Sequence, residues 1–180
     1  IWKANGAATS FSLLREINLG TEVYIEPPVI YGDHFFFSAS RSFWKSDGTT
    51  AGTVQLLAGD AQSPLFKPQI VAGDTLYGRA WDALHGEELW KTDGTTAGTQ
   101  IVKDIVPGND GTPFLGEFAE FNGQLFFRAH DNTHEAELWR SDGTEAGTVL
   151  VRDIRPGPGS SPDSYFTGFA GPLFFGPDDG

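Results

Sequence analysis

The chain of 180 residues contains no cysteine and no methionine, and only 12 of its residues are lysine or arginine. Without cysteine there is no disulfide framework, no thiol nucleophile and no zinc–thiolate site. Without methionine there is no initiator residue, so we expect a processed product, a fragment or a segment of a larger protein. A mature exported protein fits this expectation best, although no segment has the pattern of a signal peptide.

The shortage of basic residues leaves a formal charge of −12, because 24 residues are acidic. A nucleic-acid-binding protein needs clustered lysine and arginine to neutralise phosphates, and no such cluster occurs here. The same charge disfavours binding to anionic membrane surfaces. No apolar run approaches the ~20 residues that cross a bilayer, so we expect no membrane insertion.

Long stretches of good helix formers are also missing, whereas glycine (23 residues) and proline (11 residues) are abundant. Hydrophobic residues make up 39% of the chain and aromatic residues 13%, which is a globular composition. The length suits a single well-buried core. Short strands joined by tight turns are therefore expected, in an all-β domain spanning residues 1–180.

One phrase occurs four times in the sequence. It reads ELWKTDGTTAGTQIVKDI at 88–105, ELWRSDGTEAGTVLVRDI at 137–154, FWKSDGTTAGTVQLL at 43–57 and, in a degenerate form, IWKANGAATSFSLLREI at 1–17. Its tryptophans, Trp2, Trp44, Trp90 and Trp139, are 42, 46 and 49 residues apart. Repeats of this length are typical of β-propeller blades.

A second half-repeat precedes or follows each phrase. It reads VIYGDHFFFSA (29–39), IVAGDTLYGRA (70–80), EFNGQLFFRA (120–129) and GFAGPLFFGP (168–177), which predicts a β-hairpin each time. Two hairpins make a four-stranded blade. We therefore expect a β-propeller of four four-stranded blades (27–60, 68–108, 117–157, and a blade shared by 165–180 and 1–20 that closes the ring). A portion of a larger ring is the alternative.

The phrase ELW-x-x-DGT, followed by x-x-GT and a Val/Ile-Lys/Arg-Asp-Ile strand, resembles the ELWxxDGT repeat family of bacterial exported and cell-surface proteins. The resemblance covers nearly the whole chain and implies a propeller-like structure, an extracellular, periplasmic or cell-surface location, and a role in adhesion or binding. The first copy departs from the family pattern, because it carries Ala4-Asn5-Gly6 where the others carry Ser/Thr-Asp-Gly.

Residues that recur in every copy are explained most simply by packing and turns. We expect Trp2, Trp44, Trp90 and Trp139 to be buried between adjacent blades, with sugar-stacking platforms as the alternative. Acidic residues head the three DGT turns, where a carboxylate accepts backbone hydrogen bonds and glycine supplies the positive φ. Calcium binding is the alternative for these acids, Asp47, Asp93 and Asp142, and it is the only cofactor considered.

The copies differ most in the loop between their second and third strands, and variable loops on a fixed scaffold are where binding usually occurs. Trp81 is the one tryptophan outside the repeat pattern. We predict a binding face for a protein partner or a surface glycan that contains Arg79, Trp81, Asp82, His85, Arg128, His130, Asp131 and His134. The histidines 130 and 134 are interpreted as solvated loop residues, because a lone pair of histidines is a weak metal signal.

No catalytic motif is present: the sequence has no G-x-S-x-G elbow, no HExxH and no phosphate-binding glycine loop. We therefore predict a non-enzymatic, secreted or surface-displayed module for protein–protein attachment in a larger assembly. A carbohydrate-binding propeller is the alternative. A glycoside-active enzyme, in which Glu87, Glu88, Glu135 and Glu137 supply paired carboxylates, is a third and weaker hypothesis, because Glu88 and Glu137 belong to the repeated phrase.

Overall fold

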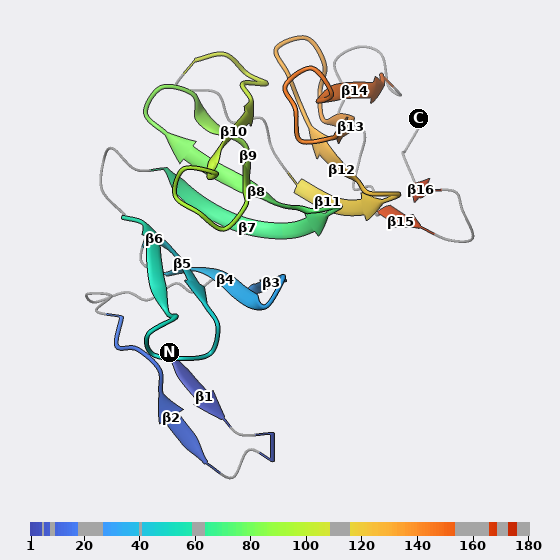
Figure 1. Ribbon diagram of the computed structural model, residues 1–180. Coiled ribbons are helices and arrows are strands. Elements are labelled where there is room, and N and C mark those ends of the chain that lie inside the picture. Colours follow the sequence, from blue (N-terminus) through green and yellow to red (C-terminus); the bar gives the residue numbers. More distant parts are fainter. Residues whose placement is uncertain are drawn as a thin grey trace.

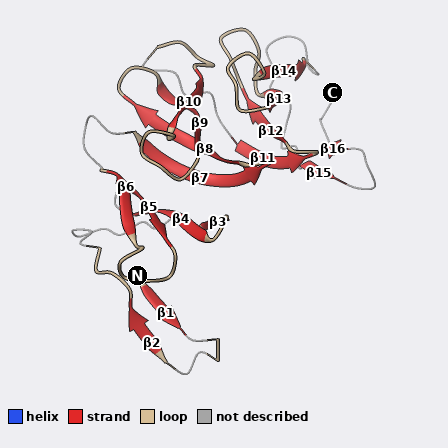
Figure 2. Cartoon of the chain, in the orientation of Figure 1, coloured by secondary structure: helices blue, strands red, loops and turns tan. Residues whose placement is uncertain are grey.

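The computed structural model describes residues 1–4, 6–7, 10–17, 27–39, 41–58, 64–108, 116–153, 166–168 and 173–175. Within these ranges every regular element is a β-strand (Figure 2). The described residues include no helix that is long and apolar enough to cross a membrane. The expected all-β class is confirmed.

Three sheets of the structure have four antiparallel strands in simple sequential order, and each consists of two hairpins. The first sheet contains β3 (Val29–Tyr31), β4 (His34–Ala39), β5 (Ser42–Ser46) and β6 (Val54–Leu57). The second contains β7 (Leu65–Ala72), β8 (Thr75–Asp82), β9 (Gly86–Thr92) and β10 (Gln100–Lys103). The third contains β11 (Gly116–Phe121), β12 (Gln124–Ala129), β13 (Glu137–Ser141) and β14 (Val149–Arg152). This is the blade-like unit that the repeats predict.

Two further sheets have two strands each. One pairs β1 (Trp2–Ala4) with β2 (Phe11–Leu13), and the other pairs β15 (Phe166–Gly168) with β16 (Leu173–Phe175). Figure 1 shows these hairpins at the two ends of an open array, and no ladder joins them among the described strands. The sheets are therefore not closed into a ring, and the blade expected from 165–180 and 1–20 is present as two separate hairpins.

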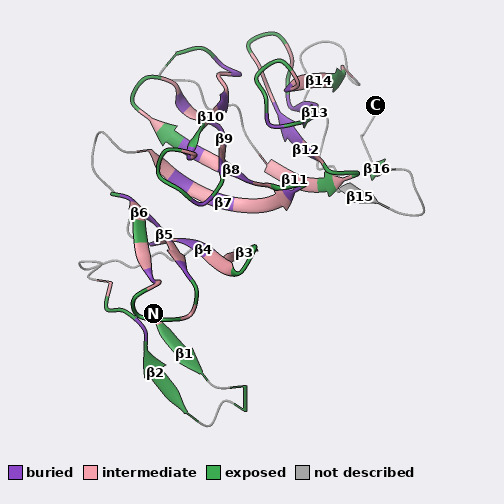
Figure 3. Cartoon of the chain, in the orientation of Figure 1, coloured by how far each residue is buried: buried purple, intermediate pink, exposed green. Residues whose placement is uncertain are grey.

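The sheets follow one another in the order of the sequence. The first strand of each contacts the first strand of the next, so that β3 contacts β7, β7 contacts β11 and β11 contacts β15. Figure 3 shows buried segments in the central strands of each four-stranded sheet, whereas β1 and β2 are exposed. The hydrophobic core consequently lies between neighbouring sheets rather than at one centre.

The repeated tryptophan of each four-stranded sheet lies in one of these interfaces. Trp90 clusters with Phe36, Phe43 and Leu57 of the preceding sheet, and Trp139 clusters with residues of the second sheet in the same way. Trp44, Trp90 and Trp139 are only 5–7% exposed.

Trp2 does not follow this pattern, and the prediction that it is buried is wrong. Its side chain is 68% exposed. The reason is that a repeated tryptophan is covered by the sheet before it, and no described sheet precedes β1.

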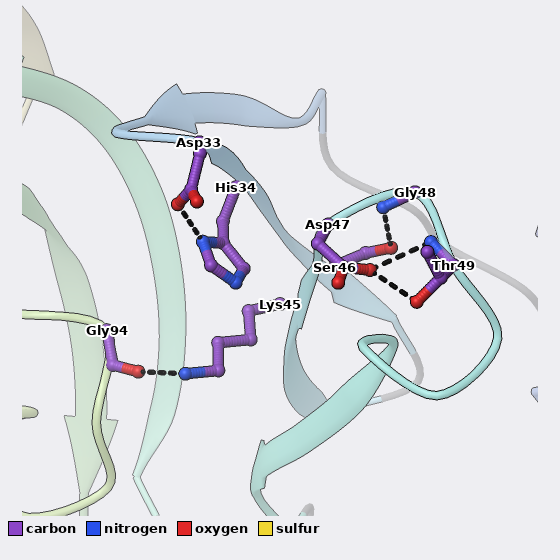
Figure 4. A network of polar contacts seen from close by, with 8 residues as sticks. All are labelled: Asp33, His34, Lys45, Ser46, Asp47, Gly48, Thr49 and Gly94. Carbon is purple, nitrogen blue, oxygen red and sulfur yellow. Dashed lines mark hydrogen bonds and ion pairs between the residues drawn. The ribbon is translucent and has the colours of Figure 1, made fainter.

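The repeated DGT turns are held together by a fixed set of hydrogen bonds. In the first turn, Asp47 Oδ1 accepts from the backbone N–H of Thr49 at 2.8 Å and from its hydroxyl at 2.7 Å (Figure 4). The Thr49 hydroxyl accepts in turn from the N–H of Gly52 at 2.9 Å. The two later turns repeat these bonds with the same atoms. The turn sequence is therefore a structural requirement of each hairpin.

The second glycine of each DGT turn is needed because no side chain would fit at its position. A Cβ on Gly52, Gly98 or Gly147 would lie 2.0 Å from the Oδ1 of the acid that heads the turn. The carboxylate therefore occupies the volume in which any other residue would carry its side chain.

We expect Gly98→Ala to destabilise the protein by roughly 1–3 kcal/mol, because the new methyl group overlaps the Asp93 carboxylate. Chemical denaturation measures the loss. The clash is a pairwise effect, so Asp93→Ala combined with Gly98→Ala should cost less than the sum of the two single changes. Gly6→Ala is the control, because nothing lies within 4 Å of its added Cβ. Additive losses in the double variant would contradict this explanation.

Trp90→Ala should cost about 3–5 kcal/mol by leaving a cavity between two sheets. That is a large part of the ~5–15 kcal/mol that stabilises a typical domain. Trp2→Ala is the matched control at the same repeat position, and its exposure predicts a change within about 1 kcal/mol. If both variants lost the same unfolding free energy, burial between sheets would not explain how much the repeated tryptophan stabilises the protein.

Candidate functional site

The loops between second and third strands lie on one face of the array. Because neighbouring strands are antiparallel, the turns β7–β8 and β9–β10 lie at one end of the second sheet and the loop β8–β9 at the other. The same holds for the loop β12–β13 in the third sheet. In the first sheet this connection is short, and its Ser40 lies outside the described residues. The DGT turns occupy the opposite face.

A clasp between an aspartate and a histidine fixes the β8–β9 loop. Asp82 Oδ1 accepts from the backbone N–H groups of Leu84 and His85, both at 2.8 Å. His85 Nδ1 lies 2.9 Å from Asp82 Oδ2. The loop backbone is therefore tied to a single side chain, and its conformation is defined before any partner binds.

The β12–β13 loop contains the same clasp. Asp131 Oδ1 accepts from the N–H of Thr133 at 2.7 Å and of His134 at 2.6 Å, and His134 Nδ1 lies 3.0 Å from Asp131 Oδ2. The sequence interpretation treated these loops as variable and missed the shared feature. The signal was available, because the pattern D-x-x-H starts at 82 and again at 131, 49 residues later, like the tryptophans 90 and 139.

Each clasp shifts the ionisation of both partners. Hydrogen bonding to the aspartate raises the pKa of His85 and of His134. Burial alone would raise the pKa of Asp82 and of Asp131, but the hydrogen bonds from the histidine ring and from the loop backbone outweigh it and lower the pKa of both acids. Each clasp thus favours the charged form of both partners.

Two large apolar side chains of the β8–β9 region are exposed. Trp81, at the end of β8, is 40% exposed, and Leu84, within the clasped loop, is 77% exposed. Beside them, Arg79 Nη1 lies 3.9 Å from Glu87 Oε2. The sequence prediction included Arg79, Trp81, Asp82 and His85 but missed Leu84, although an isolated leucine in a polar loop was a readable signal. The structure brings these residues together at one end of the second sheet.

Arg128 is a correction to the predicted binding face. It is only 7% exposed, and its Nη1 lies 3.7 Å from Oε1 of Glu117 on β11. The arginine is enclosed because its strand is the second in a sheet that is covered by neighbours. The accessible part of the prediction in the third sheet is the loop with His130, Asp131 and His134.

Two of the four carboxylates considered for glycoside chemistry lie inside the sheets, whereas Glu87 is half-buried and Glu135 is exposed. Glu88 is 0% exposed and Glu137 is 1% exposed. Glu88 Oε1 accepts from the backbone N–H of Val106 at 2.9 Å, which ties β9 to the segment after β10. Burial, assisted by the charge of Asp104, raises the pKa of Glu88 to about 7. These contacts support a structural role for the repeated glutamate.

The acids considered for calcium are each occupied by their own turn. Hydrogen bonds from the threonine hydroxyl and the threonine N–H lower the pKa of Asp47, Asp93 and Asp142. Across the part of the chain that the structure describes, no group of three or more His, Asp or Glu residues could hold a metal ion. The described geometry thus gives calcium one carboxylate per turn.

Replacing the buried glutamate should change how stability depends on pH. The unfolded chain releases this proton near pH 4.5, whereas folded Glu88 releases it near pH 7. Folding therefore takes up a proton in this window, and the free energy of unfolding falls as pH rises from 4.5 to 7. Glu88→Gln keeps the acceptor for Val106 and removes the titration, so its unfolding free energy should depend less on pH. Denaturant melts from pH 4.5 to 8 measure this, with the exposed Glu145→Gln as control. Parallel curves for wild type and Glu88→Gln would contradict it.

Comparison of the chain with protein-family models, with curated protein sequences and with solved structures gave no match. The resemblance to the ELWxxDGT repeat family therefore stays a prediction from the repeated phrase.

Proposed function

We propose that the chain is a non-catalytic binding domain of the β-propeller type that attaches to a protein partner within a larger assembly. The resemblance of its repeats to the ELWxxDGT family supports an exported protein of a bacterial cell surface, periplasm or extracellular space. The three blade-like sheets, whose first strands contact one another in sequence order, support the propeller architecture.

The observation that carries the binding proposal is the exposure of Trp81 and Leu84 on a loop whose backbone is already fixed. Tryptophan is enriched among the residues that dominate protein interfaces. A preformed loop loses little conformational entropy on binding, so more of the contact energy appears as affinity. The Asp82–His85 clasp supplies that rigidity.

A glycan is the second candidate. Trp81 offers a ring face for stacking on a sugar, and Arg79 and Glu87 beside it offer hydrogen-bonding groups. Leu84 favours a protein, because a freely exposed aliphatic side chain contributes to apolar contact and not to sugar recognition. We therefore place the glycan second.

A photo-cross-linking amino acid at position 84 tests the proposal. In an extract of a bacterial cell envelope, we expect one discrete protein adduct, because the loop face contacts its partner. Adding Trp81→Ala should weaken capture roughly 30-fold, the loss typical of a hot-spot residue worth ~2 kcal/mol. The variant should keep its unfolding free energy to within about 1 kcal/mol, since the tryptophan is a surface residue.

The matched control places the same cross-linker at exposed Glu145, in a DGT turn on the opposite face. Equal adducts at 84 and 145 would indicate nonspecific capture and contradict the loop face. A glycan array on the same domain separates the two candidates. Glycan binding that Trp81→Ala abolishes, without a protein adduct, would favour the carbohydrate-binding propeller.

A further inference from the structure

Cationic side chains tie each repeat to the sheet that follows it. The lysine after the tryptophan donates from Nζ to the glycine carbonyl oxygen of the next DGT turn: Lys3 to Gly48 at 3.1 Å, Lys45 to Gly94 at 3.0 Å (Figure 4) and Lys91 to Gly143 at 2.7 Å. A second bond joins Arg15 to the carbonyl of Thr53 and Lys103 to that of Thr148, both at 3.1 Å. Because these bonds recur at fixed repeat positions, they belong to the interface between successive repeats.

The third sheet exposes the donors of this interface. Arg140 and Arg152 follow Lys91 and Lys103 by 49 residues each, and both are exposed. Val151 between them is 44% exposed. The equivalent lysines of the second sheet are half-buried against their neighbour. The face of the third sheet thus carries the groups that contact a following DGT-type hairpin.

The hairpin β1–β2 exposes the side that would receive such donors from a preceding repeat. Trp2, Phe11 and Leu13 are 68%, 66% and 46% exposed, whereas the equivalent Trp44 is 7% exposed. Trp44 is covered by Ile1 and Ile17, and the Arg15 guanidinium lies 5.4 Å from its ring centroid. Trp2 therefore presents a surface that elsewhere in the chain accepts a preceding repeat and its arginine.

The two short hairpins are complementary halves of one blade. The contact of β15 with β11 places β15–β16 where the first hairpin of a sheet stands, and β1–β2 corresponds to the second hairpin. In complete sheets the second and third strands pair, with Phe127 opposite Trp139 and Phe126 opposite Arg140. In the same register, Phe175 would pair with Trp2, Phe174 with Lys3 and Leu173 with Ala4.

We propose that β16 of one copy of this chain pairs with β1 of a second copy in this register, with Arg140 and Arg152 of the first copy against the Gly6 turn and Trp2 of the second. This inference rests on the propeller arrangement proposed above. Pairing completes a four-stranded sheet, buries Trp2 and removes two free strand edges, which otherwise promote aggregation.

A second copy is favoured over the chain's own β1 because the two hairpins lie at opposite ends of the array (Figure 1). Two copies related by a two-fold axis form this contact twice, since each supplies one β16 and one β1. The assembly is then closed, because neither β16 nor β1 keeps a free edge that could recruit a further copy.

Cysteine cross-linking tests the pairing, and the chain has no cysteine of its own to interfere. Lys3→Cys and Phe174→Cys proteins, mixed and mildly oxidised, should give a disulfide-linked heterodimer at twice the 19.5 kDa mass in non-reducing gels and mass spectra. The double variant Phe126→Cys/Arg140→Cys is the positive control, because these residues are paired within one sheet. Lys3→Cys mixed with Thr167→Cys is the negative control, since β15 lies one strand further away.

Sedimentation of the wild type should show a concentration-dependent shift from one chain mass to two. Arg140→Glu should weaken this dimer, and Arg140→Lys should retain it. In the double variant Lys3→Cys/Phe174→Cys, a disulfide formed only within one chain would overturn the second copy while supporting a ring closed by the chain itself. Equal cross-linking to Thr167, or a monomer at all concentrations, would overturn the pairing. None of these outcomes depends on the loop-face cross-link at residue 84, so the two proposals fail separately.

Discussion

Trp90 and Trp139 each lie between two sheets, Trp44 lies between its sheet and the residues that flank the β1–β2 hairpin, and the array of sheets depends on this packing. A single four-stranded sheet has two faces and cannot bury either by itself, so its stability comes from its neighbours. A tryptophan, like phenylalanine and tyrosine, buries ~150–250 Å², so it contributes much of the apolar contact at these interfaces. Their indole Nε1 atoms have no hydrogen-bond partner among the described residues, so apolar contact is what the three side chains contribute.

The features that could be predicted from the sequence are local. Hairpins and DGT turns are encoded within a few residues, because a carboxylate, a threonine hydroxyl and a glycine without Cβ complete the turn by themselves. Trp2 was mispredicted because burial depends on a neighbouring sheet that the phrase around it does not encode. Arg128 was mispredicted because its burial depends on neighbouring strands, including Glu117 on β11, which the sequence around the arginine does not encode.

The candidate binding face also contains residues that could be predicted from the sequence and residues that could not. The exposed Trp81 could be predicted from its place outside the repeat. The clasps of Asp82 with His85 and of Asp131 with His134 were not predicted. The two loops differ in most residues, and the D-x-x-H spacing that they share occurs in only two of the repeats. Glu88 could not be predicted to be buried from its polar side chain. It is buried because its carboxylate accepts a hydrogen bond from a backbone N–H of another segment.

The three lysine-to-carbonyl bonds have the same direction: in each, the earlier repeat donates and the following repeat accepts. Because the acceptor is a backbone oxygen, its chemistry does not depend on which residue follows. A duplicated or deleted repeat would therefore meet its new neighbours through the same contacts as before. A repeat with these contacts suits evolution by tandem gene duplication. The number of repeats can change while the residues between sheets stay the same, and the loops between second and third strands remain free to diverge.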